Sequence, residues 1–421
     1  MRPFTRRHFL VAAGASTVAA MFPHAVRGQA ARPHVVVVGG GFGGATAAKY
    51  LRHWGAGAVD VTLVDSRPNH PSCILSNLVL NDQVTLRSIT FGFDGLSSRF
   101  GVRVVRDRVD RIEPDLRQVR LASGEHVRYD RLVLSPGITF DRVPGLDSRL
   151  VPHAWKAGGQ THLLRRQLAA LPSGGTFVMS ISPVPYRCPP GPYERACVVA
   201  DYLRREKGGG QVIVLDANPQ IIAERHTFTT AFEQTYAGII DYRPDTSVVE
   251  VDSAGRALHT AAGEVVRGDV ANVIPAQRAP GLLRRAGLVN DASRRWAGVD
   301  PLGYESTAHP GIHVIGDAQA TGQPKAGHIA NAEAKICADA ILRAFEGLPP
   351  DPEPVTNSAC YSPITSDTAS WLTAAFRYDA ATGAMKVVPE SSGEAESPTR
   401  ENYRDMFGWA NNLFADTFGL S

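Results

Sequence analysis

The 421-residue sequence has no long apolar run and little net charge. No apolar stretch approaches the roughly 20 residues that a helix needs to cross a bilayer, so no membrane span is expected. The formal net charge is +3, which gives little electrostatic reason to expect nucleic acid as a partner. Hydrophobic residues make up 43% and charged residues 20% of the chain, as in a globular protein with room for two or three domains.

Cysteine is also scarce, and the five residues are Cys73, Cys188, Cys197, Cys337 and Cys360. None of them begins a C-x-x-C-H motif, so no haem is expected on this chain itself. Cys197 and Cys337 lie among apolar residues at helical spacing and are predicted to be buried core positions. An odd number of cysteines in an oxidising compartment leaves at least one outside intramolecular disulfides.

The beginning of the chain has the composition of an export signal. A basic start containing Arg6 and Arg7 precedes a modest apolar stretch, Phe9 to Phe22. Paired arginines favour the twin-arginine route, which exports proteins already folded around a cofactor; an ordinary secretory signal or an amphipathic anchor is the alternative. Residues 1–30 are therefore predicted to be removed, and the mature protein is expected in the periplasm.

The stretch HVVVVGGGFGGATAAKYLRHWG predicts a strand, a glycine turn and a helix. Val35 to Val38 form the continuous apolar run of a buried parallel strand. A second strand, VDVTLVD, ends in Asp65. Glycines let a backbone approach a pyrophosphate at a helix N-terminus, and a carboxylate accepts hydrogen bonds from a ribose. The glycines of this dinucleotide-binding fingerprint are Gly39, Gly41, Gly43 and Gly44.

A second unit repeats the strand, turn, helix and strand pattern without that fingerprint. GGTFVMSI and QVIVLD are strand-like, and RACVVADYL is helix-like. The turn between them is SPVPYRCPPGPYE, in which Cys188 stands among prolines. Proline lacks the N–H donor that would cradle a phosphate. This unit is predicted to keep a nucleotide-binding fold without binding NAD(P).

Further motifs give a resemblance to a known family. The first glycine turn, LVLSPG and GIHVIGDA resemble two-dinucleotide-domain flavoproteins of the disulfide reductase type. Within that group, RPNHPSCILSNLVL, YRCPPGPYE, GQPKAGHIANAEAK and TNSACYSPI are similar to the flavoprotein subunit of flavocytochrome c sulfide dehydrogenase. The similarity covers essentially the whole mature chain. CPPGPYE and the cysteine of NHPSCILSN are its specific parts.

The resemblance implies an α/β fold with two Rossmann-like dinucleotide-binding domains of glutathione reductase type and a smaller C-terminal α+β domain. Residues 31–150 and 282–350 are expected to form a discontinuous FAD-binding domain, and 151–281 the second domain. The tail, 351–421, is expected to contain a hairpin in FRYDAATGAMKVV and a final helix in YRDMFGWANNLFADTFG.

The resemblance also implies oxidation of sulfide to sulfane sulfur or polysulfide, with FAD as cofactor and a separate c-type cytochrome subunit, in a heterodimer, as acceptor. Cys73 matches the cysteine that forms a thioether to the flavin 8α carbon. Cys188 and Cys360 match a redox disulfide, and Glu194 matches a nearby acid that manages protons. The other expected cofactor contacts are the four fingerprint glycines, Asp65, Pro136, Gly137, Gly316, Asp317, Lys325 and Gly327.

Alternatives stay open at several of these positions. Cys188 is close enough in sequence to pair with Cys197 instead of Cys360. Lys325 is either a group beside the flavin or a solvated surface lysine. Phe407 and Trp409 lie either near the flavin or on an ordinary apolar helix face.

Three other functions remain alternatives. The first is a sulfide:quinone oxidoreductase, an enzyme of the same broad fold, which needs an apolar surface to contact quinone and the bilayer. The chain is also compatible with an accessory flavoprotein of a thiosulfate-oxidation system. An NAD-linked disulfide reductase is disfavoured by export, by the prolines of the second turn and by the lack of a C-x₄-C pair in the FAD domain.

Overall fold

Strand β1 (His34–Val38) lies inside a seven-stranded sheet of the computed structural model, which describes residues 32–420. It pairs in parallel with β2 (Asp60–Asp65) and with β9 (Arg131–Leu134). The sheet continues through β5 (Arg103–Arg106) at one edge and, at the other, through β21 (Ile312–Val314), β20 (Glu305–Ser306) and β19 (Val299–Asp300). The expected export signal, residues 1–30, lies outside the described residues.

Helices α1 (Phe42–Trp54) and α7 (Gly327–Phe345) pack on one another beside this sheet. Val35, Val37 and Ala45 are fully buried in the same apolar cluster, as the continuous apolar run of β1 predicts. α8 (Arg400–Phe418) contacts α1 and completes this layer. The predicted first strand, glycine turn, helix and acid-terminated strand are thus all present.

A four-stranded parallel sheet forms the second Rossmann-like unit, in the order β13-β12-β11-β17. Its strands and helices are β11 (Thr176–Ile181), β12 (Gln211–Asp216), β13 (Ile240–Arg243), β17 (Val270–Val273), α3 (Gly159–Ala170), α4 (Gly191–Glu206) and α5 (Arg225–Thr230). Five of the six residues of β11 are buried, which is what a strand covered on both faces requires. The α/β fold class predicted from the sequence is confirmed.

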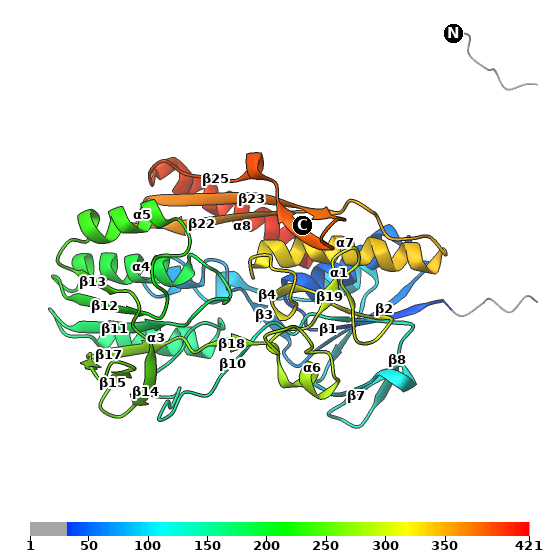
Figure 1. Cartoon of the computed structure of the whole chain (residues 1–421), viewed down its shortest axis with the longest axis horizontal. Helices are drawn as coiled ribbons and strands as arrows, with labels where there is room; N and C mark the ends of the chain where they lie inside the picture. The colour runs from blue at the N-terminus through cyan, green and yellow to red at the C-terminus, as the bar shows by residue number, and fades with distance from the viewer. Residues whose placement is uncertain (1–31, 421) are drawn as a thin grey trace, which may run out of the picture. The chain divides into compact units, whose positions relative to one another are not determined.

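The C-terminal strands cover both units. β22 (Val355–Pro363) pairs with β23 (Ala369–Asp379), which pairs with β24 (Ala384–Val387) and β25 (Gly393–Glu394). The expected hairpin and final helix are present. β22 contacts α7 of the first unit and α4 of the second, and Figure 1 shows the orange C-terminal strands above the green and the yellow helices. The tail therefore brings residues of β22 to the boundary between the two units.

The remaining elements are short. The described residues also contain β3 (Asn69–Pro71), β4 (Thr90–Gly92), β6 (Val109–Glu113), β7 (Gln118–Leu121), β8 (His126–Arg128), β10 (Thr139–Phe140), β14 (Val248–Asp252), β15 (Ala257–Thr260), β16 (Val265–Arg267), β18 (Gln277–Arg278), α2 (Asp94–Phe100) and α6 (Gly281–Arg285). Single turns are η1 (Ser76–Val79), η2 (Arg87–Ile89), η3 (Pro114–Leu116), η4 (Ala231–Thr235), η5 (Gly316–Ala318) and η6 (Pro389–Ser391). The limits of the individual domains stay a prediction.

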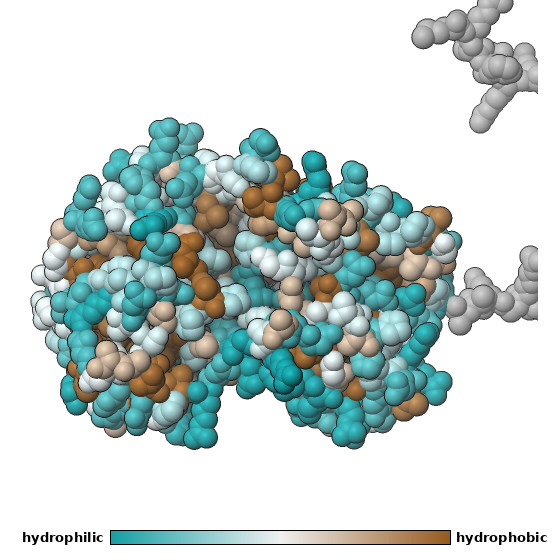
Figure 2. Space-filling view, viewed as in Figure 1, coloured by the Kyte–Doolittle hydropathy of each residue, from teal (hydrophilic) through white to brown (hydrophobic). Residues whose placement is uncertain are grey.

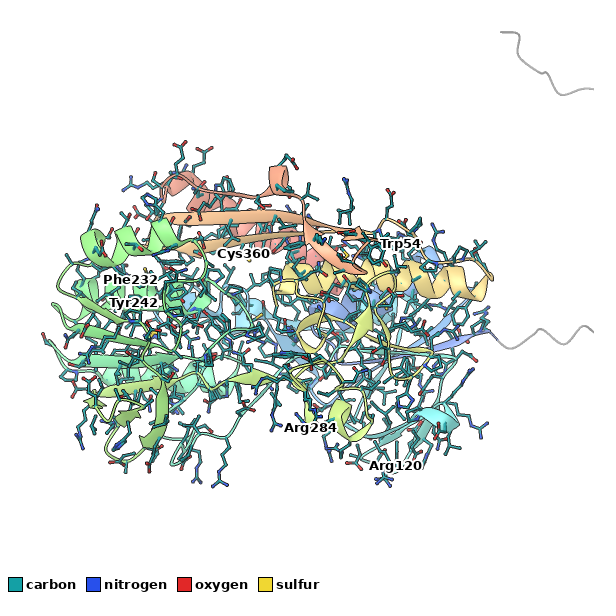
Figure 3. All side chains as sticks on the ribbon, in the orientation of Figure 1. Trp54, Arg120, Phe232, Tyr242, Arg284 and Cys360 are labelled. Atoms are coloured by element: carbon teal, nitrogen blue, oxygen red, sulfur yellow. The ribbon has the colours of Figure 1, made fainter. Side chains whose placement is uncertain are left out.

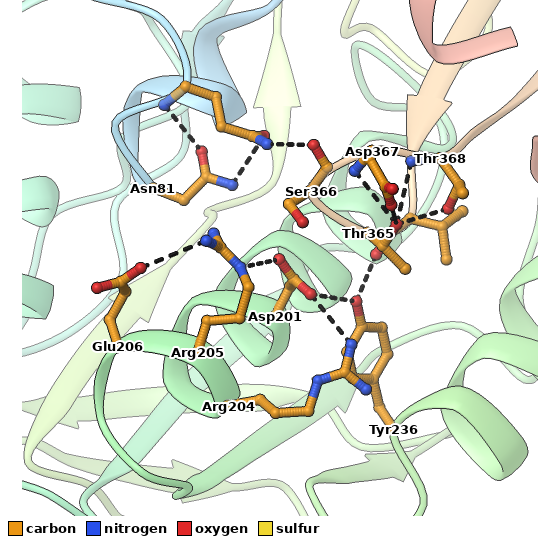
Figure 4. Close-up of polar contacts among 12 residues, drawn as sticks. Asn81, Asp201, Arg204, Arg205, Glu206, Tyr236, Thr365, Ser366, Asp367 and Thr368 are labelled. Carbon is orange, nitrogen blue, oxygen red and sulfur yellow. Dashed lines mark hydrogen bonds and ion pairs between the residues drawn. The ribbon is translucent and has the colours of Figure 1, made fainter. Parts of the chain in front are cut away.

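A polar cluster fixes the loop that follows β22 (Figure 4). Tyr236 donates a hydrogen bond of 2.6 Å to the carbonyl oxygen of Ile364, and its hydroxyl lies 3.4 Å from Asp201 of α4. Gln83 donates a bond of 2.6 Å to the carbonyl oxygen of Ser366. Because the loop is bonded from two directions, the end of β22 is held against α4.

Candidate functional site

A cavity of about 160 Å³ opens beside the glycine turn, and we call it the glycine-turn cavity. All the expected cofactor contacts line it except Gly44 and Lys325. The contacts come from the ends of β1, β2, β9 and β21 and from the beginning of α7. Carboxyl ends of parallel strands are the edge where α/β sheets bind nucleotides. The structure therefore gathers these residues at one place.

The glycines of this cavity are required by close backbone approaches. Gly39 has φ +99°, and a Cβ built there lies 2.3 Å from the carbonyl oxygen of Ser135. A Cβ at Gly44 lies 1.8 Å from the carbonyl oxygen of Gly39. Gly44 thus serves the packing of α1 on the turn rather than the lining of the cavity. A turn this bare, at the N-terminus of a 13-residue helix, fits the diphosphate of a dinucleotide.

Polar groups around the cavity also fit a dinucleotide cofactor. Asp65 ends β2 and accepts a hydrogen bond of 2.7 Å from the backbone N–H of Gly40. The ring of His70 lines the cavity, and both its nitrogens are buried without a hydrogen-bond partner among the described residues. Burial, with the charges of Arg67 and Arg187, lowers the pKa of His70 to about 3. The ring is thus a neutral polar group available to a bound molecule.

The third landmark of the sequence, GIHVIGDA, ends in the single turn η5. The backbone N–H of Gly316 donates a bond of 2.6 Å to Glu333 of α7. Burial raises the pKa of Glu333 to about 8. Burial also raises the pKa of Asp317, against the nearby charges of Arg187, Lys325 and Lys156. The turn carrying Asp317 is therefore fixed from the helix behind it.

Lys325 is buried, with 7% of its surface exposed, so the solvated-lysine alternative is wrong. Its Nζ donates a bond of 2.7 Å to the carbonyl oxygen of Gln319 and lies 3.8 Å from the centre of the Trp296 ring. Burial lowers the pKa of Lys325 to about 8. The side chain does not line the glycine-turn cavity, and its contact with a cofactor stays a prediction.

A second cavity of about 60 Å³ lies next to the first, and we call it the cysteine cavity. Cys188, Cys360 and Glu194 all line it, although they come from a loop, from β22 and from α4. Cys73, Arg187 and Gly327 line both cavities. Cys73 therefore lies where the cofactor cavity meets the cavity of the other two cysteines.

Cys188 is held in a left-handed backbone conformation, with φ +61°. Its N–H donates a bond of 2.7 Å to the carbonyl oxygen of Lys325, and its carbonyl oxygen accepts one of 3.0 Å from Gly191. A Cβ built at Gly191 lies 2.7 Å from the sulfur of Cys188. Non-glycine residues adopt this conformation mainly where the surroundings impose it, often at functional sites. The first residue of α4 is glycine because the cysteine occupies that space.

Cys360 lies in β22 opposite Leu372 of β23, where the C-terminal sheet covers the boundary between the two units (Figure 3). None of the five cysteines, all of them among the described residues, forms a disulfide in the structure. Burial and the charge of Glu194 raise the pKa of the Cys188 thiol well above its usual range. Burial and the charge of Glu224 raise the pKa of Cys360 to about 12. Both thiols therefore hold their protons at neutral pH.

Cys197 and Cys337 are fully buried in α4 and α7, which confirms the prediction that they are core residues. Neither lines the cysteine cavity. The cysteine cavity is lined by Cys73, Cys188 and Cys360. The pairing of Cys188 stays a prediction.

Glu194 is the acid of the cysteine cavity and is 8% exposed. Asn77 of η1 donates a bond of 3.0 Å to its Oε1 and one of 3.1 Å to the carbonyl oxygen of Gly191. Burial raises the pKa of Glu194 to about 8; the bond from Asn77 lowers it and the charge of Glu224 raises it. A carboxyl group with such a pKa exchanges protons readily near neutral pH.

Arg195 is a cation that the sequence patterns did not single out. It is 2% exposed, and its guanidinium lies 4.9 Å from the centre of the Trp155 ring. It donates bonds to Asn77 (3.0 Å) and to Asn272 (2.9 Å). Burial lowers its pKa to about 9. Asn77 thus joins the cation to Glu194, a link that no local spacing in the sequence signals.

Trp409 lines the cysteine cavity, whereas Phe407 packs against the main apolar cluster. His328, at the beginning of α7, also lines the cavity. Its Nδ1 accepts a bond of 3.0 Å from the backbone N–H of Ala359. Burial lowers the pKa of His328. The neutral ring therefore carries its proton on Nε2.

The second unit has its own strand-terminal acid, Asp216 of β12, which is fully buried. It accepts hydrogen bonds from the hydroxyls of Tyr193 (2.8 Å) and Tyr242 (2.9 Å) and from the N–H of Asn218 (2.9 Å). In a nucleotide-binding unit this acid accepts hydrogen bonds from the ribose. Here internal donors occupy it, in agreement with a second unit that binds no NAD(P).

Three protein-family models match the chain in sequence order. Residues 33–167 match pyridine nucleotide-disulphide oxidoreductases. Residues 161–275 match the central part of the sulfide dehydrogenase [flavocytochrome c] flavoprotein chain, and residues 352–418 match the flavin-binding part of flavocytochrome c sulphide dehydrogenase. Together these matches reach from β1 to the end of α8.

Known proteins give a consistent comparison. The chain is 53% identical over 45 residues to a sulfide dehydrogenase [flavocytochrome c] flavoprotein chain from Chlorobaculum thiosulfatiphilum, covering 11% of this chain and 92% of that sequence. It is 23% identical over 310 residues to the mitochondrial sulfide:quinone oxidoreductase of Mus musculus, covering 67% of this chain and 65% of that protein. The chain thus spans slightly less than two thirds of the mouse protein.

Among solved structures, the sulfide:quinone oxidoreductase of Aquifex aeolicus superposes with a TM-score of 0.76 at 18% identity. The superposition covers 92% of each chain. At this identity the likeness shows a shared fold.

Proposed function

Because the chain belongs to the family of flavoprotein chains of flavocytochrome c sulfide dehydrogenase, we propose that it oxidises hydrosulfide to sulfane sulfur or polysulfide and passes the electrons to a c-type cytochrome subunit. The family is one of FAD-dependent sulfide oxidoreductases. The observation that carries the proposal is the cysteine cavity, where Cys188, Cys360 and Glu194 meet and which Cys73 joins to the glycine-turn cavity.

FAD fits the glycine-turn cavity. Gly39, Gly41 and Gly43 would hold its diphosphate, Asp65 its ribose and Asp317 its ribityl-phosphate region. FAD takes up an electron pair and releases electrons singly to haem. The N-terminus of α7 begins at Gly327, which lines both cavities, and its positive potential favours negative charge on a reduced flavin. Cys73, which lines both cavities, is proposed to carry the covalent link to the 8α carbon.

Cys188 and Cys360 are proposed to form the redox disulfide. Hydrosulfide attacks one sulfur, the S–S bond breaks, and the products are a persulfide on one cysteine and a thiolate on the other. Because burial raises the pKa of both thiols, the thiolate formed there is a strong base that takes up a proton. Closing the disulfide again would release the sulfane sulfur and the two protons held by the persulfide and the thiol, and the electron pair would pass to bound FAD. Glu194, beside both cysteines, is proposed to receive and return the proton.

A cytochrome is the favoured acceptor over quinone. No helix in the described range 32–420 is both long and apolar enough to cross a membrane. The exposed face of α8 carries Glu401, Arg404 and Asp405. Exposed large apolar side chains come from many elements, among them Trp54, Leu116 and Val249, and the face drawn in Figure 2 has brown patches scattered among teal ones. The face drawn in Figure 2 shows no continuous apolar band of the kind that a bilayer-facing quinone site would require.

The proposed setting is the periplasm, reached by the twin-arginine route with the cofactor in place. An accessory role in thiosulfate oxidation would use the same cysteines. The assay of electron acceptors must therefore separate a sulfide dehydrogenase from an accessory flavoprotein.

The test is anaerobic electron transfer from sulfide with the purified FAD-loaded chain. We expect sulfide-dependent reduction of added c-type cytochrome, little reduction of a short-chain quinone, and co-purification with a haem protein from the native host. Reduction of quinone without reduction of cytochrome would favour the quinone oxidoreductase. No sulfide-dependent reduction of either acceptor would favour the accessory role.

A further inference from the structure

Glu224 is a buried acid that the proposed chemistry does not use. It lies just before α5, with 4% of its surface exposed. Its Oε2 accepts a hydrogen bond from the hydroxyl of Ser362, two residues beyond Cys360 on β22. Its Oε1 is buried and has no hydrogen-bond partner among the described residues. A buried carboxyl group left half-satisfied is costly, so a structural role alone is a poor account of it.

The surroundings of Glu224 connect the cysteine cavity with the protein surface. On the inner side its charge acts on Cys360 of β22 and on Glu194 and Cys197 of α4. On the outer side Glu394 of β25 acts on Glu224, and Glu394 is exposed. Figure 1 shows α5 beside the left-hand ends of β22 and β23.

Hydroxyl groups complete the surroundings of this carboxyl group. Ser362 of β22 and Ser370 of β23 both stabilise its charged form, and Ser370 lies 3.4 Å from Thr227 of α5. The elements packed around Glu224 thus present two acids, two thiols and hydroxyl groups to it. A carboxyl group that is hydrogen-bonded to a hydroxyl group can pass a proton by changing hydrogen-bond partners.

The proposed reaction produces a proton that must leave. Oxidation of one hydrosulfide to sulfane sulfur releases two electrons and one proton. The electrons leave through the cofactor to the cytochrome, which takes them without protons. The proton therefore has to pass from the buried cysteine cavity to water.

We propose that Glu224 is the proton-transfer residue that links Glu194 and Cys360 with the surface at Glu394. In each turnover Glu194 takes the proton of the oxidised hydrosulfide, Glu224 accepts it from Glu194, and water beside Glu394 accepts it from Glu224. No bond between heavy atoms changes in this step. The inference rests on the proposed function, because only sulfide oxidation supplies the proton.

The protonation equilibria allow exchange between the two acids. Burial raises the pKa of Glu224 to about 7 and that of Glu194 to about 8. Two groups whose pKa values lie this close exchange a proton without trapping it on either.

The test compares Glu224→Gln with Glu396→Gln, an exposed glutamate two residues past Glu394 that serves as control. FAD-loaded protein is mixed with sulfide, and proton release is followed with a pH-indicator dye while flavin bleaching is followed in parallel. We expect Glu224→Gln to slow proton release by on the order of 10²-fold, to be rescued by a small weak acid such as azide, and to leave the first bleaching event intact. Equal proton release in Glu224→Gln and wild type would overturn the relay.

A second readout does not depend on turnover. Because the charge of Glu224 raises the pKa of Cys360, Glu224→Gln should shift alkylation of Cys360 in reduced holoprotein to lower pH, and Glu396→Gln should not. Ser362→Ala keeps the carboxyl group but removes its hydrogen bond, so it should shift the proton-release profile to higher pH. Unchanged profiles in both variants would overturn the proposal. If wild-type protein fails to bleach with sulfide at all, the proposed function fails instead.

Discussion

The side-chain amide of Asn77 donates a hydrogen bond of 3.0 Å to Oε1 of Glu194, and its oxygen accepts one of 3.0 Å from Arg195. One neutral side chain thereby stands between a buried acid and a buried cation. A direct ion pair would keep Glu194 ionised. With Asn77 between the two groups, burial dominates and the pKa of Glu194 rises to about 8.

Replacing Asn77 by leucine should change both the pKa of Glu194 and the stability of the folded chain. Glu194 loses the hydrogen bond that lowers its pKa, so the pH at which sulfide-dependent bleaching reaches half its maximum rate moves upward. Arg195 loses a buried acceptor, and the free energy of unfolding should fall by roughly 1–3 kcal/mol. Stopped-flow bleaching between pH 6 and 10, together with urea denaturation, measures both effects. The exposed Asn290→Ala variant is the control, and an unshifted pH profile in Asn77→Leu would remove Asn77 from the proton chemistry.

Stability should depend on pH through the buried acids. Glu194, Glu224 and Glu333 have pKa values of about 8, 7 and 8 in the folded chain, above their ordinary value of 4.5. Between these limits the folded state binds more protons than the unfolded state. The contribution of each acid to the free energy of unfolding is full below about pH 4.5 and falls as pH rises, by about 1.4 kcal/mol per pH unit, until its folded pKa is passed.

The difference between wild type and Glu333→Gln isolates one such acid, since histidines and other groups contribute equally to both. We expect the wild-type curve from urea denaturation to fall more steeply than that of the variant between about pH 5 and 8, and the two to run parallel above it. Parallel curves throughout would show that Glu333 is ionised in the folded chain.

The covalent flavin link should depend on Cys73 alone. Cys73 is the cysteine that lines both cavities, whereas Cys337 is buried in α7. On a denaturing gel viewed under ultraviolet light after acid treatment, wild type and Cys337→Ala should show a fluorescent band and Cys73→Ser none. If flavin washes out of the denatured wild type, the assignment of Cys73 is wrong.

The second Rossmann-like unit should not bind a nicotinamide nucleotide. Its acid Asp216 accepts bonds from Tyr193, Tyr242 and Asn218, and its turn is rich in proline. NADH and NADPH at millimolar concentration should neither bleach the flavin nor raise the melting temperature. Tyr242→Phe should lower stability by roughly 1–3 kcal/mol, because a buried acid loses a donor. A nucleotide-dependent rise in melting temperature would contradict the assignment.

Local patterns predicted the parts of the fold that depend on local physics. The apolar run of β1, the glycine turn and the acid of β2 follow from periodicity and backbone sterics, and the buried positions of Cys197 and Cys337 follow from helical spacing. The loss of a phosphate cradle at the proline-rich turn stays a prediction.

Long-range contacts among polar residues were not predictable in this way. Asn77, Arg195 and Glu224 come from separate elements: Asn77 of η1 meets Arg195 of α4, and Glu224 meets Ser362 because the tail returns over α4. Lys325 shows the same limit, since nothing in its neighbourhood in sequence distinguishes a lysine buried against Trp296 from one in solvent. Such contacts depend on packing between elements, which has no periodic signal.

The central claim is that Cys188 and Cys360 act together as the redox disulfide beside the flavin. The most direct measurement is anaerobic, sulfide-dependent bleaching of the flavin absorbance in Cys188→Ser and Cys360→Ser, with Cys197→Ser as the matched control. We expect either cavity variant to lose rapid bleaching and Cys197→Ser to bleach like wild type. Normal bleaching in both cavity variants, or its loss in Cys197→Ser alone, would contradict that claim.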